Sequence, residues 1–298
     1  MLINSLIVSS FMIIISFAGG LGNQMFQYAL FKKFQLLGKN VKGDFNFYNK
    51  NKAHNGFELE KVFNLKIPKA SQEEINKLKD TSDFLRKYRR FFRIFWKSTD
   101  IEQINFDFDD SIFALDNAYL NGYWQSEKYF KDISEQLRRD FAFRNIDLAN
   151  KKMLEKINGT ESVSIHIRRG DYESDPHTKK LLGGICIISY YKRAIDIIQS
   201  KINNPYFFIF SDDLNWAREN FRFLSKCFFV DINHSENSYK DMLLMSHCNH
   251  NIIANSSFSW WGAWLNNNPN KIVIAPSKWF NNKRLDSKDI VPESWIRL

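Results

Sequence analysis

Short apolar segments alternate with amphipathic segments along most of the chain, and this alternation limits the fold more than any other feature. Five apolar runs in the second half are predicted to be buried strands: SVSIHI (162–167), PYFFIF (205–210), CFFV (227–230), NIIA (251–254) and KIVIA (271–275). Between consecutive runs the apolar residues recur at helical spacing. Strands that alternate with helices predict a parallel sheet with helices on its faces.

The first half opens with the same pattern. A β-branched run at Ile13–Phe17 ends in a Gly-Gly pair, a helical pattern follows as far as Gly38, and a second strand is expected over 41–45. Strand, glycine turn, helix and strand make a βαβ unit. The chain is therefore predicted to be an α/β protein in both halves.

The chain length and one polar stretch predict how the halves are divided. With 298 residues, the chain is too long for one small core and suits two domains of ordinary size. Because 145–158 is polar, we expect an N-terminal α/β domain over 1–150 and a C-terminal one over 151–298. Residues 1–11 are interpreted as an appendage, since Met12 would serve as a start and the apolar run is too short to span a bilayer. A weak membrane anchor is the alternative.

Basic residues outnumber acidic ones, 42 against 33, which gives a formal net charge of +9. This balance suits an anionic ligand, an anionic membrane surface or a nucleic acid. We expect no nucleic-acid partner, because the arginines gather at one strand end and no recognised nucleic-acid module occurs. The basic segment 70–100 is expected to be helical and to be either a solvated face or a membrane contact.

The cysteines and histidines predict neither disulfides nor a metal site. Cys186, Cys227 and Cys248 lie far apart, which argues against a disulfide framework and suits a reducing cytosol. His247 and His250 have the spacing H-x-x-H, but no third ligand stands nearby in the sequence.

The stretch GGLGNQ (19–24) lies where the first strand turns into the first helix. A dinucleotide fingerprint would need a third glycine where Met25 stands, so a nicotinamide or flavin site is not predicted. Gly20 and Gly22 imply a close approach to the backbone, and Asn23 and Gln24 offer amides at a helix N-terminus. The alternative is a tight turn that holds no ligand.

The stretch HIRRGDY (166–172) puts two arginines at the end of a predicted strand. Guanidinium groups pair bidentately with phosphate, so Arg168 and Arg169 together predict a clamp for a diphosphate. The alternative is a structural ion pair with Asp171, which we expect for at most one of the two arginines.

The stretch NIIANSSFSWW (251–261) ends a strand and begins a helix at Asn255-Ser256-Ser257. Free backbone N–H groups and the helix dipole predict an anion site there, with plain capping as the alternative. The tryptophans of SWWGAW (259–264) are expected in the core, and SDD (211–213) is expected to cap another helix.

Taken together, GGLGNQMFQYA, GYWQSEKYF, HIRRGDY, FIFSDD and IIANSSFSWWGAWL resemble the motifs of bacterial α-1,2-fucosyltransferases of glycosyltransferase family 11, especially enzymes that build fucosylated O-antigen repeats. The resemblance runs from about residue 13 to the C-terminal PESWIRL. It implies a GT-B-like fold with two Rossmann-like domains facing a central cleft. It also implies a GDP-fucose donor, a β-galactoside acceptor, inversion at the anomeric carbon, and no metal or cofactor.

The same resemblance implies a cytoplasmic enzyme, with peripheral contact to the inner face of the bacterial inner membrane where the acceptor is a lipid-linked oligosaccharide. Transfer of another sugar from a nucleotide diphosphate donor is the alternative, since the sequence would look similar.

By resemblance, His166 contacts the guanosine, Arg168 holds the diphosphate, and Arg169 and Asp171 complete the motif and support its loop. Asp241 is assigned to guanine, whose N–H donors suit a carboxylate. Ser257 is assigned to phosphate, with Ser256 and Phe258 beside it, and Asn23 with Gly22 to the sugar and diphosphate. The expected catalytic residues are Arg168, Asn23 and Asp171.

The general base stays unassigned. Inversion requires that the acceptor hydroxyl lose its proton, commonly to a carboxylate or a histidine. One related family uses a glutamate ten residues past the motif histidine, where this chain has Pro176. The remaining candidates are Asp44, His54, Asp171, Glu173 and Asp175. A relay through water is the alternative.

Overall fold

The computed structural model describes residues 11–50, 55–79, 99–285 and 287–298 and contains two parallel sheets. The first sheet has the order β2-β1-β4-β3, with β1 Ile13–Ser16, β2 Val41–Asp44, β3 Asp100–Glu102 and β4 Ala118–Asn121. All its neighbouring strands are parallel, and Ile13 lies opposite both Val41 and Ala118. Strands β1, β2 and β4 are mostly buried, as expected in a parallel sheet with helices on its faces, whereas the edge strand β3 has no fully buried residue.

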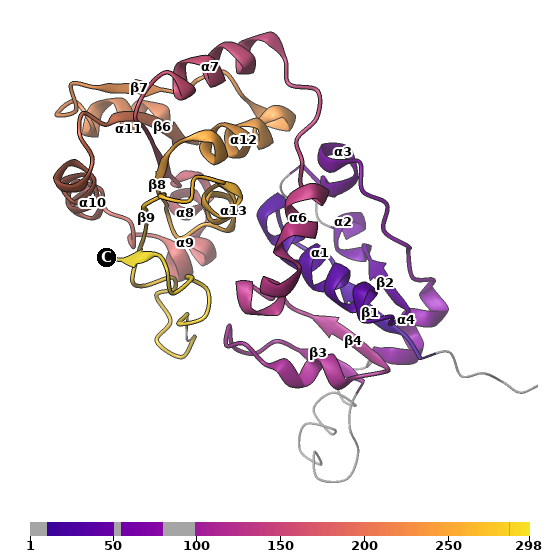
Figure 1. Cartoon of the computed structure of the whole chain (residues 1–298). Helices are drawn as coiled ribbons and strands as arrows, with labels where there is room; N and C mark the ends of the chain where they lie inside the picture. The colour runs from indigo at the N-terminus through magenta and orange to yellow at the C-terminus, as the bar shows by residue number, and fades with distance from the viewer. Residues whose placement is uncertain (1–10, 51–54, 80–98, 286) are drawn as a thin grey trace, which may run out of the picture.

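The second sheet has the order β10-β9-β8-β5-β6-β7. Its strands are β5 Ser162–Ile167, β6 Tyr206–Ser211, β7 Cys227–Phe229, β8 His250–Ile252, β9 Val273–Ala275 and β10 Ile296–Arg297. The five predicted runs of the second half are all strands, and β10 is an addition that its two-residue length left undetected. We refer to residues 11–141 as the first lobe and to the remainder as the second lobe (Figure 1).

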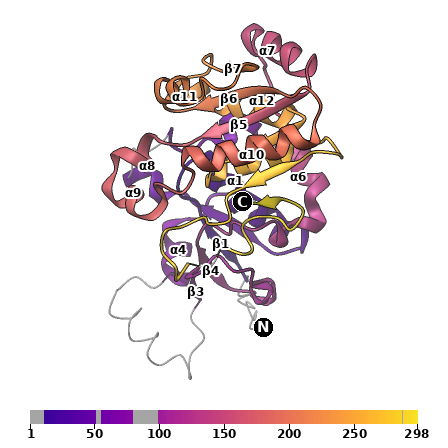
Figure 2. The same ribbon diagram turned by 90° about the vertical axis from the view of Figure 1, so that its left-hand side faces the viewer.

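Helices cover both sheets. They are α1 Leu21–Leu36, α2 Asn46–Lys50, α3 Leu59–Phe63, α4 Gln72–Leu78, α6 Ser134–Asp140, α7 Leu148–Asn158, α8 Gly170–Ser174, α9 Pro176–Leu182, α10 Ile188–Lys201, α11 Leu214–Asn220, α12 Tyr239–His247 and α13 Ser257–Leu265. Figure 2 shows the sheet of the second lobe above that of the first, with α8 and α9 on one side.

Three sequence predictions concern the N-terminal segment, the segment 70–100 and the boundary between the domains. Residues 1–10, most of the expected appendage, lie outside the described residues. The expected helix over 70–100 is seen only as α4, which Ser71 and Glu74 begin with a capping box, because 80–98 also lie outside. The chain passes between the lobes through α6 and α7, so the boundary at 150/151 would fall inside α7; it stays a prediction.

Aromatic side chains join the two lobes into one continuous core. Phe26 of α1 lies 4.5 Å from Trp260 and 4.9 Å from Trp261 of α13, measured between ring centroids. Phe130 stacks on Trp261 at 5.4 Å. Trp260 and Trp261 are fully buried, which confirms that these tryptophans belong to the core. Buried aromatic pairs contribute strongly to packing energy, so the lobes are held in contact by α1 and α13.

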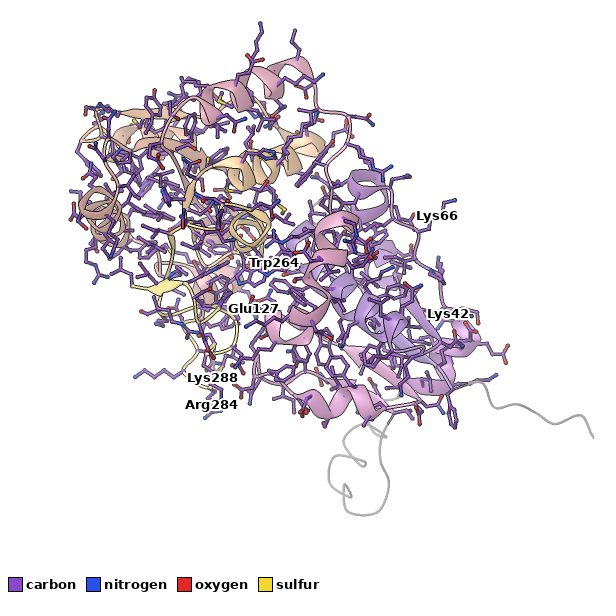
Figure 3. All side chains as sticks on the ribbon, viewed as in Figure 1. Lys42, Lys66, Glu127, Trp264, Arg284 and Lys288 are labelled. Atoms are coloured by element: carbon purple, nitrogen blue, oxygen red, sulfur yellow. The ribbon has the colours of Figure 1, made fainter. Side chains whose placement is uncertain are left out.

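Two further contacts hold the lobes together. The Arg138 guanidinium of α6 lies 4.4 Å from the Trp264 ring, and Figure 3 shows Trp264 at the junction of the lobes. The segment after β9 reaches back to the first lobe, where Asp289 accepts hydrogen bonds from Phe108 N at 2.8 Å and Lys128 Nζ at 2.6 Å.

Candidate active site

A cavity of about 990 Å³ lies between the lobes and is lined by residues from both. From the second lobe it receives the segments that follow β5, β6, β7 and β8, at the carboxyl ends of those strands. From the first lobe it receives the turn after β1 and the residues before α3. This position is where parallel α/β sheets bind their ligands, and the volume is large enough for a nucleotide and a sugar.

Two helix N-termini meet at the cavity. The first turn of α1 (20–23) and that of α13 (255–258) both line it. A Cβ on Gly22 would lie 2.5 Å from the carbonyl carbon of Ser257 and 2.7 Å from Phe258 N, so only glycine fits. Trp261 Nε1 also donates to the Gly22 carbonyl oxygen at 2.9 Å. The close approach that the glycines predicted is therefore a contact between the two helices, and both helix N-termini lie at one cavity.

The two amides of GGLGNQ have different surroundings. Asn23 lines the cavity, and its Oδ1 accepts a 2.7 Å hydrogen bond from Gln125 Nε2. Gln24 is fully buried and does not line the cavity. Its Nε2 donates to the carbonyl oxygens of Gly19 and Gly56, at 3.0 and 2.8 Å. Gln24 thus ties the glycine turn to the segment before α3 instead of offering its amide to a ligand.

Arg168 lines the cavity and is held by two carboxylates. Its Nη2 lies 2.7 Å from Asp171 Oδ1, and its Nη1 lies 3.0 Å from Asp212 Oδ2. Asp212 Oδ1 also accepts from Arg169 N at 2.8 Å. A Cβ on Gly170 would lie 2.8 Å from Asp212 Oδ2, so the glycine of HIRRGD makes room for this carboxylate. The guanidinium is oriented before any ligand arrives.

Arg169 does not line the cavity. Its Nε donates to Asp213 Oδ2 at 3.2 Å, its Nη1 lies 3.5 Å from Glu173 Oε1, and its guanidinium carbon lies 4.3 Å from the Trp216 ring centroid. Both arginines are therefore in structural ion pairs, and the expected clamp of two arginines is corrected to a single cavity-lining arginine. Adjacent residues leaving a strand point to opposite sides, which separates the two guanidinium groups.

His166 lies at the end of β5, lines the cavity and is almost fully buried. Its Nδ1 has no hydrogen-bond partner among the described residues. Its pKa is lowered to about 4, mainly by burial; the Asp212 charge opposes this shift and the Arg168 charge adds to it. The imidazole is neutral near pH 7, and a buried polar atom without a partner is a place for a ligand hydrogen bond.

Asp241, in the first turn of α12, lines the cavity from the second lobe. Its Oδ1 accepts a 2.8 Å hydrogen bond from Asn233 Nδ2. Asn233 and Asn150 of α7 exchange side-chain hydrogen bonds of 2.9 and 3.0 Å, which fixes the amide. Burial raises the pKa of Asp241 to about 7, with Asn233 opposing the shift and the charge of Asp231 adding to it.

The candidates for the general base lie in different places. Asp44 is buried outside the cavity lining and accepts from Tyr119 Oη and Asn46 N, at 2.8 and 2.9 Å. Glu173 pairs with Arg169 and Lys179 outside the lining, and Asp175 caps α9. These three are corrected: the structure does not place them at the cavity. Asp171 lines it but pairs with Arg168.

His54, the remaining candidate, lies outside the described residues. The two histidines of H-x-x-H do not converge on one point. His247 Nδ1 contacts Leu243 O at 2.9 Å, whereas His250 lies in β8 with its ring between Glu161 and Ile272. Within the described ranges, no cluster of three or more metal-ligating side chains occurs.

Comparison with known proteins decides the family. The model for "Glycosyl transferase family 11" matches residues 9–298. The chain belongs to this family. Alpha-1,2-colitosyltransferase of Escherichia coli is 37% identical over 94% of this chain and 97% of its own length. The O-antigen biosynthesis glycosyltransferase WbnK of Escherichia coli is 33% identical over 94% of this chain and 98% of its own.

The chain is also similar to a more distant relative, and its fold is similar to that of a solved structure. Galactoside alpha-(1,2)-fucosyltransferase 1 of Mus musculus is 26% identical over 83% of this chain and 61% of its own length. Arabidopsis thaliana FUT1 in complex with GDP superimposes with a TM-score of 0.53 at 10% identity, covering 97% of this chain and 76% of that chain. The fold is GT-B-like, with two Rossmann-like units facing a central cleft, as the resemblance implied.

Within this family 11 chain, sequence reasoning missed four cavity residues. Asp212 orients Arg168, Asn233 orients Asp241, Gln125 holds Asn23, and Glu58 lines the cavity from the first lobe. Asp212 had a signal, since it follows the strand next to β5 at the same sheet edge. Gln125 is part of the motif GYWQSEKYF, whereas Asn233 and Glu58 are single polar residues in loops that only their place in three dimensions distinguishes.

Proposed function

We propose that the chain is an inverting glycosyltransferase that moves L-fucose from GDP-β-L-fucose to the 2-hydroxyl of a terminal β-galactoside, in O-antigen or other surface-glycan synthesis. One observation carries the proposal: a single cavity brings together Arg168, the N-terminus of α13 and Asp241. The first two suit a diphosphate and the third suits guanine.

The donor would lie along the second-lobe wall. Guanine donates from N1–H and its 2-amino group, which Asp241 can accept, and the free Nδ1 of His166 is available to the nucleoside. The diphosphate would lie between Arg168 and the first turn of α13 at Ser256, Ser257 and Phe258. Asn23 and Gly22 would face the same phosphates and the sugar from the first lobe.

The leaving diphosphate gains negative charge as the sugar–oxygen bond breaks. Asp171 and Asp212 offset the charge of Arg168, so Arg168 acts mainly through oriented N–H donors. The partial positive charge at the ends of α1 and α13 supplies the rest of the stabilisation. In this proposal Arg169 supports the loop through Asp213 and Trp216 without touching the donor.

A second donor is favoured by the similarity to the colitosyltransferase. Colitose is fucose without its 3-hydroxyl group, so one pocket could take either sugar. A site that hydrogen-bonds a hydroxyl rejects the analogue that lacks it by about 10⁴–10⁵, whereas a site without such a partner discriminates weakly. We therefore propose GDP-colitose as the alternative donor.

Incubation with GDP-fucose or GDP-colitose and a panel of β-galactosides tests the proposal. We expect a 1,2-linked product with inverted anomeric configuration, read by NMR, and a ratio of kcat/KM values that names the donor. We propose that the chemistry needs no metal, so EDTA should leave the rate unchanged. Absence of transfer from both donors, together with absence of GDP binding, would refute the function.

The place of the reaction is also a proposal. None of the helices within the described ranges has the length and apolar content needed to cross a bilayer. A lipid-linked oligosaccharide acceptor would put the enzyme at the cytoplasmic face of the inner membrane, in peripheral contact. Flotation with acidic-phospholipid vesicles tests this contact, since binding through basic residues should fall as salt is raised.

A further inference from the structure

Glu58, immediately before α3, faces the cavity from the first lobe. Five other carboxylates line the cavity within the described residues, and all of them come from the second lobe: Asp171, Asp212, Asp213, Asp231 and Asp241. Glu58 therefore stands opposite the wall to which we assign the donor. An acceptor between the two lobes would have its hydroxyl groups on the side of Glu58.

The second-lobe carboxylates already have partners. Asp171 and Asp212 pair with Arg168, and Asp213 pairs with Arg169. Asp231 lies 3.6 Å from both Arg218 and His234, and Asp241 is bonded to Asn233. A carboxylate engaged by a cation is a weaker proton acceptor, because the cation favours the ionised form.

Glu58 makes no ion pair within 4 Å with any described residue, and its Oε1 accepts a 3.2 Å hydrogen bond from the neutral amide of Asn55. The three histidines that line the cavity belong to the second lobe: His177 and His234 are exposed, and the pKa of the buried His166 is lowered to about 4, which makes it a weak base. Among the described residues, Glu58 and Asp241 are thus the two cavity carboxylates without an ion pair within 4 Å, and Glu58 is the one that lies away from the wall assigned to the donor.

The backbone of Glu58 is fixed to the start of α1. Glu58 N donates to Gln24 Oε1 at 2.8 Å, and Gln24 Nε2 donates to Gly56 O and Gly19 O. Gln24 is fully buried, so these three bonds are shielded from water. The same helix start packs against Ser257 through Gly22. Glu58 is therefore held at a set position relative to the N-terminus of α13.

The surroundings of Glu58 suit proton transfer. Burial raises its pKa above the usual range, while Asn55, the charge of Lys61 and the backbone amide of Leu21 lower it. Tyr48 also lies close enough for its ionisation to depend on Glu58. A carboxylate with a raised pKa is a stronger base than an unperturbed one.

We propose that Glu58 is the catalytic base that takes the proton of the attacking acceptor hydroxyl. This inference rests on the proposed function. The acceptor oxygen forms a bond to the anomeric carbon of the sugar, and its proton moves to a Glu58 carboxylate oxygen. The bond from the anomeric carbon to the diphosphate breaks, and its electron pair leaves with the nucleoside diphosphate. The step consumes no oxidant or reductant.

Glu58→Gln keeps the size of the side chain and removes the base, so it is the decisive variant. We expect kcat to fall by about 10²–10⁴, the usual contribution of a general base. GDP affinity, measured by calorimetry, should stay within about twofold of wild type because the donor wall is intact. Glu60→Gln, two residues along on the exposed side of the same helix, is the matched control and should keep full activity.

The pH profile distinguishes a base from a merely structural residue. In wild type, kcat should fall as pH is lowered through the pKa of Glu58, and Glu58→Gln should lose this acidic limb. Glu58→Asp should recover part of the rate and restore the limb. It also serves as the test if Glu58→Gln does not fold.

Two results would overturn the assignment: a folded Glu58→Gln protein with kcat within about threefold of wild type, or one whose residual rate keeps the wild-type acidic limb. Failure of the proposed function looks different. In that case the wild-type protein itself neither binds GDP nor transfers sugar.

Discussion

The two walls of the cavity are built from different chemistry. The second-lobe wall carries Arg168, five carboxylates and the N-terminus of α13. The first-lobe wall carries a glycine turn, the amides of Asn23 and Gln125, the rings of Phe106 and Tyr123, and one carboxylate. Most of the charge is on one side and is already paired there. The other side is mostly neutral, with hydrogen-bonding and apolar groups.

This difference suggests a division of roles. Charged groups that are oriented in advance suit a nucleoside diphosphate, which brings most of its charge to one place. Amides and aromatic rings suit an uncharged sugar, which is bound through hydroxyl groups and apolar ring faces. The two walls meet at Gly22 and Ser257, so donor and acceptor would come together beside the two helix N-termini.

The largest test of the comparison concerns the two adjacent arginines. Arg168→Ala should lower kcat by about 10²–10³, or roughly 3–4 kcal/mol, because it removes the oriented donors to the leaving diphosphate. Arg169→Ala, the matched control, should lower the melting temperature but cost less than about tenfold in kcat, because Arg169 does not line the cavity. If a folded Arg168→Ala enzyme kept the wild-type kcat, the donor could not be assigned to the second-lobe wall.

The second test concerns guanine. Asp241→Ala removes the acceptor for two guanine donors, and charged hydrogen bonds contribute about 1.5–3 kcal/mol each. GDP affinity should fall at least tenfold, while ADP affinity changes little because adenine lacks those donors. Calorimetry with both nucleotides measures the discrimination. An unchanged preference for GDP over ADP would mean that Asp241 has no contact with the base.

The third test concerns the junction of the walls. Gly22→Ala would push a Cβ against the backbone of Ser257 and Phe258, and overpacking of this kind costs about 1–3 kcal/mol of unfolding free energy. Gly159→Ala is the control, since its added Cβ would meet only the carbonyls of its own helix, the nearest at 3.2 Å. Urea denaturation of both variants gives the comparison. Equal stability would show that the lobes separate easily at this point.

The smallest expected effect is a pH dependence of GDP affinity, which we assign to Asp241 of the donor wall. Because burial raises the pKa of Asp241 to about 7, its carboxylate is mostly protonated at pH 6 and mostly ionised at pH 8. The ionised form accepts from guanine, so GDP affinity should rise with pH, by up to ~10-fold over this range. ADP carries the same phosphates and controls for their own titration. In Asp241→Asn, the affinities for GDP and ADP should depend on pH in the same way.

Strand and helix order could be read from the sequence because apolar periodicity is a local property. The five strands predicted for the second half are present, and Trp260 and Trp261 lie in the core as expected. Arg168 and Ser257 could be placed at the cavity because each follows a recognisable strand, and His166 because it lies at the end of one. The carboxyl ends of parallel strands share one edge, so such residues converge without knowledge of the tertiary contacts.

The position of a polar residue near a strand end did not always predict whether it lines the cavity. Arg169 and Asp44 were both predicted to be functional, yet neither lines the cavity: Arg169 pairs with Asp213 and Glu173, and Asp44 accepts from Tyr119 and Asn46. Glu58 gave no local signal, because it is a lone glutamate in front of a short helix. It reaches the cavity only because Gln24, 34 positions earlier, ties its backbone to the start of α1.

The sequence by itself determined the α/β class, the strand order along the chain and the identity of the loops that line the cavity, since these follow from residue patterns within short windows. The tertiary structure alone decided which side chains of those loops meet. The reason is that side-chain partners come from segments far apart in sequence, as with Arg168 and Asp212 or Gly22 and Ser257. No local pattern encodes those contacts, and the packing of α1 against α13 creates the most consequential of them.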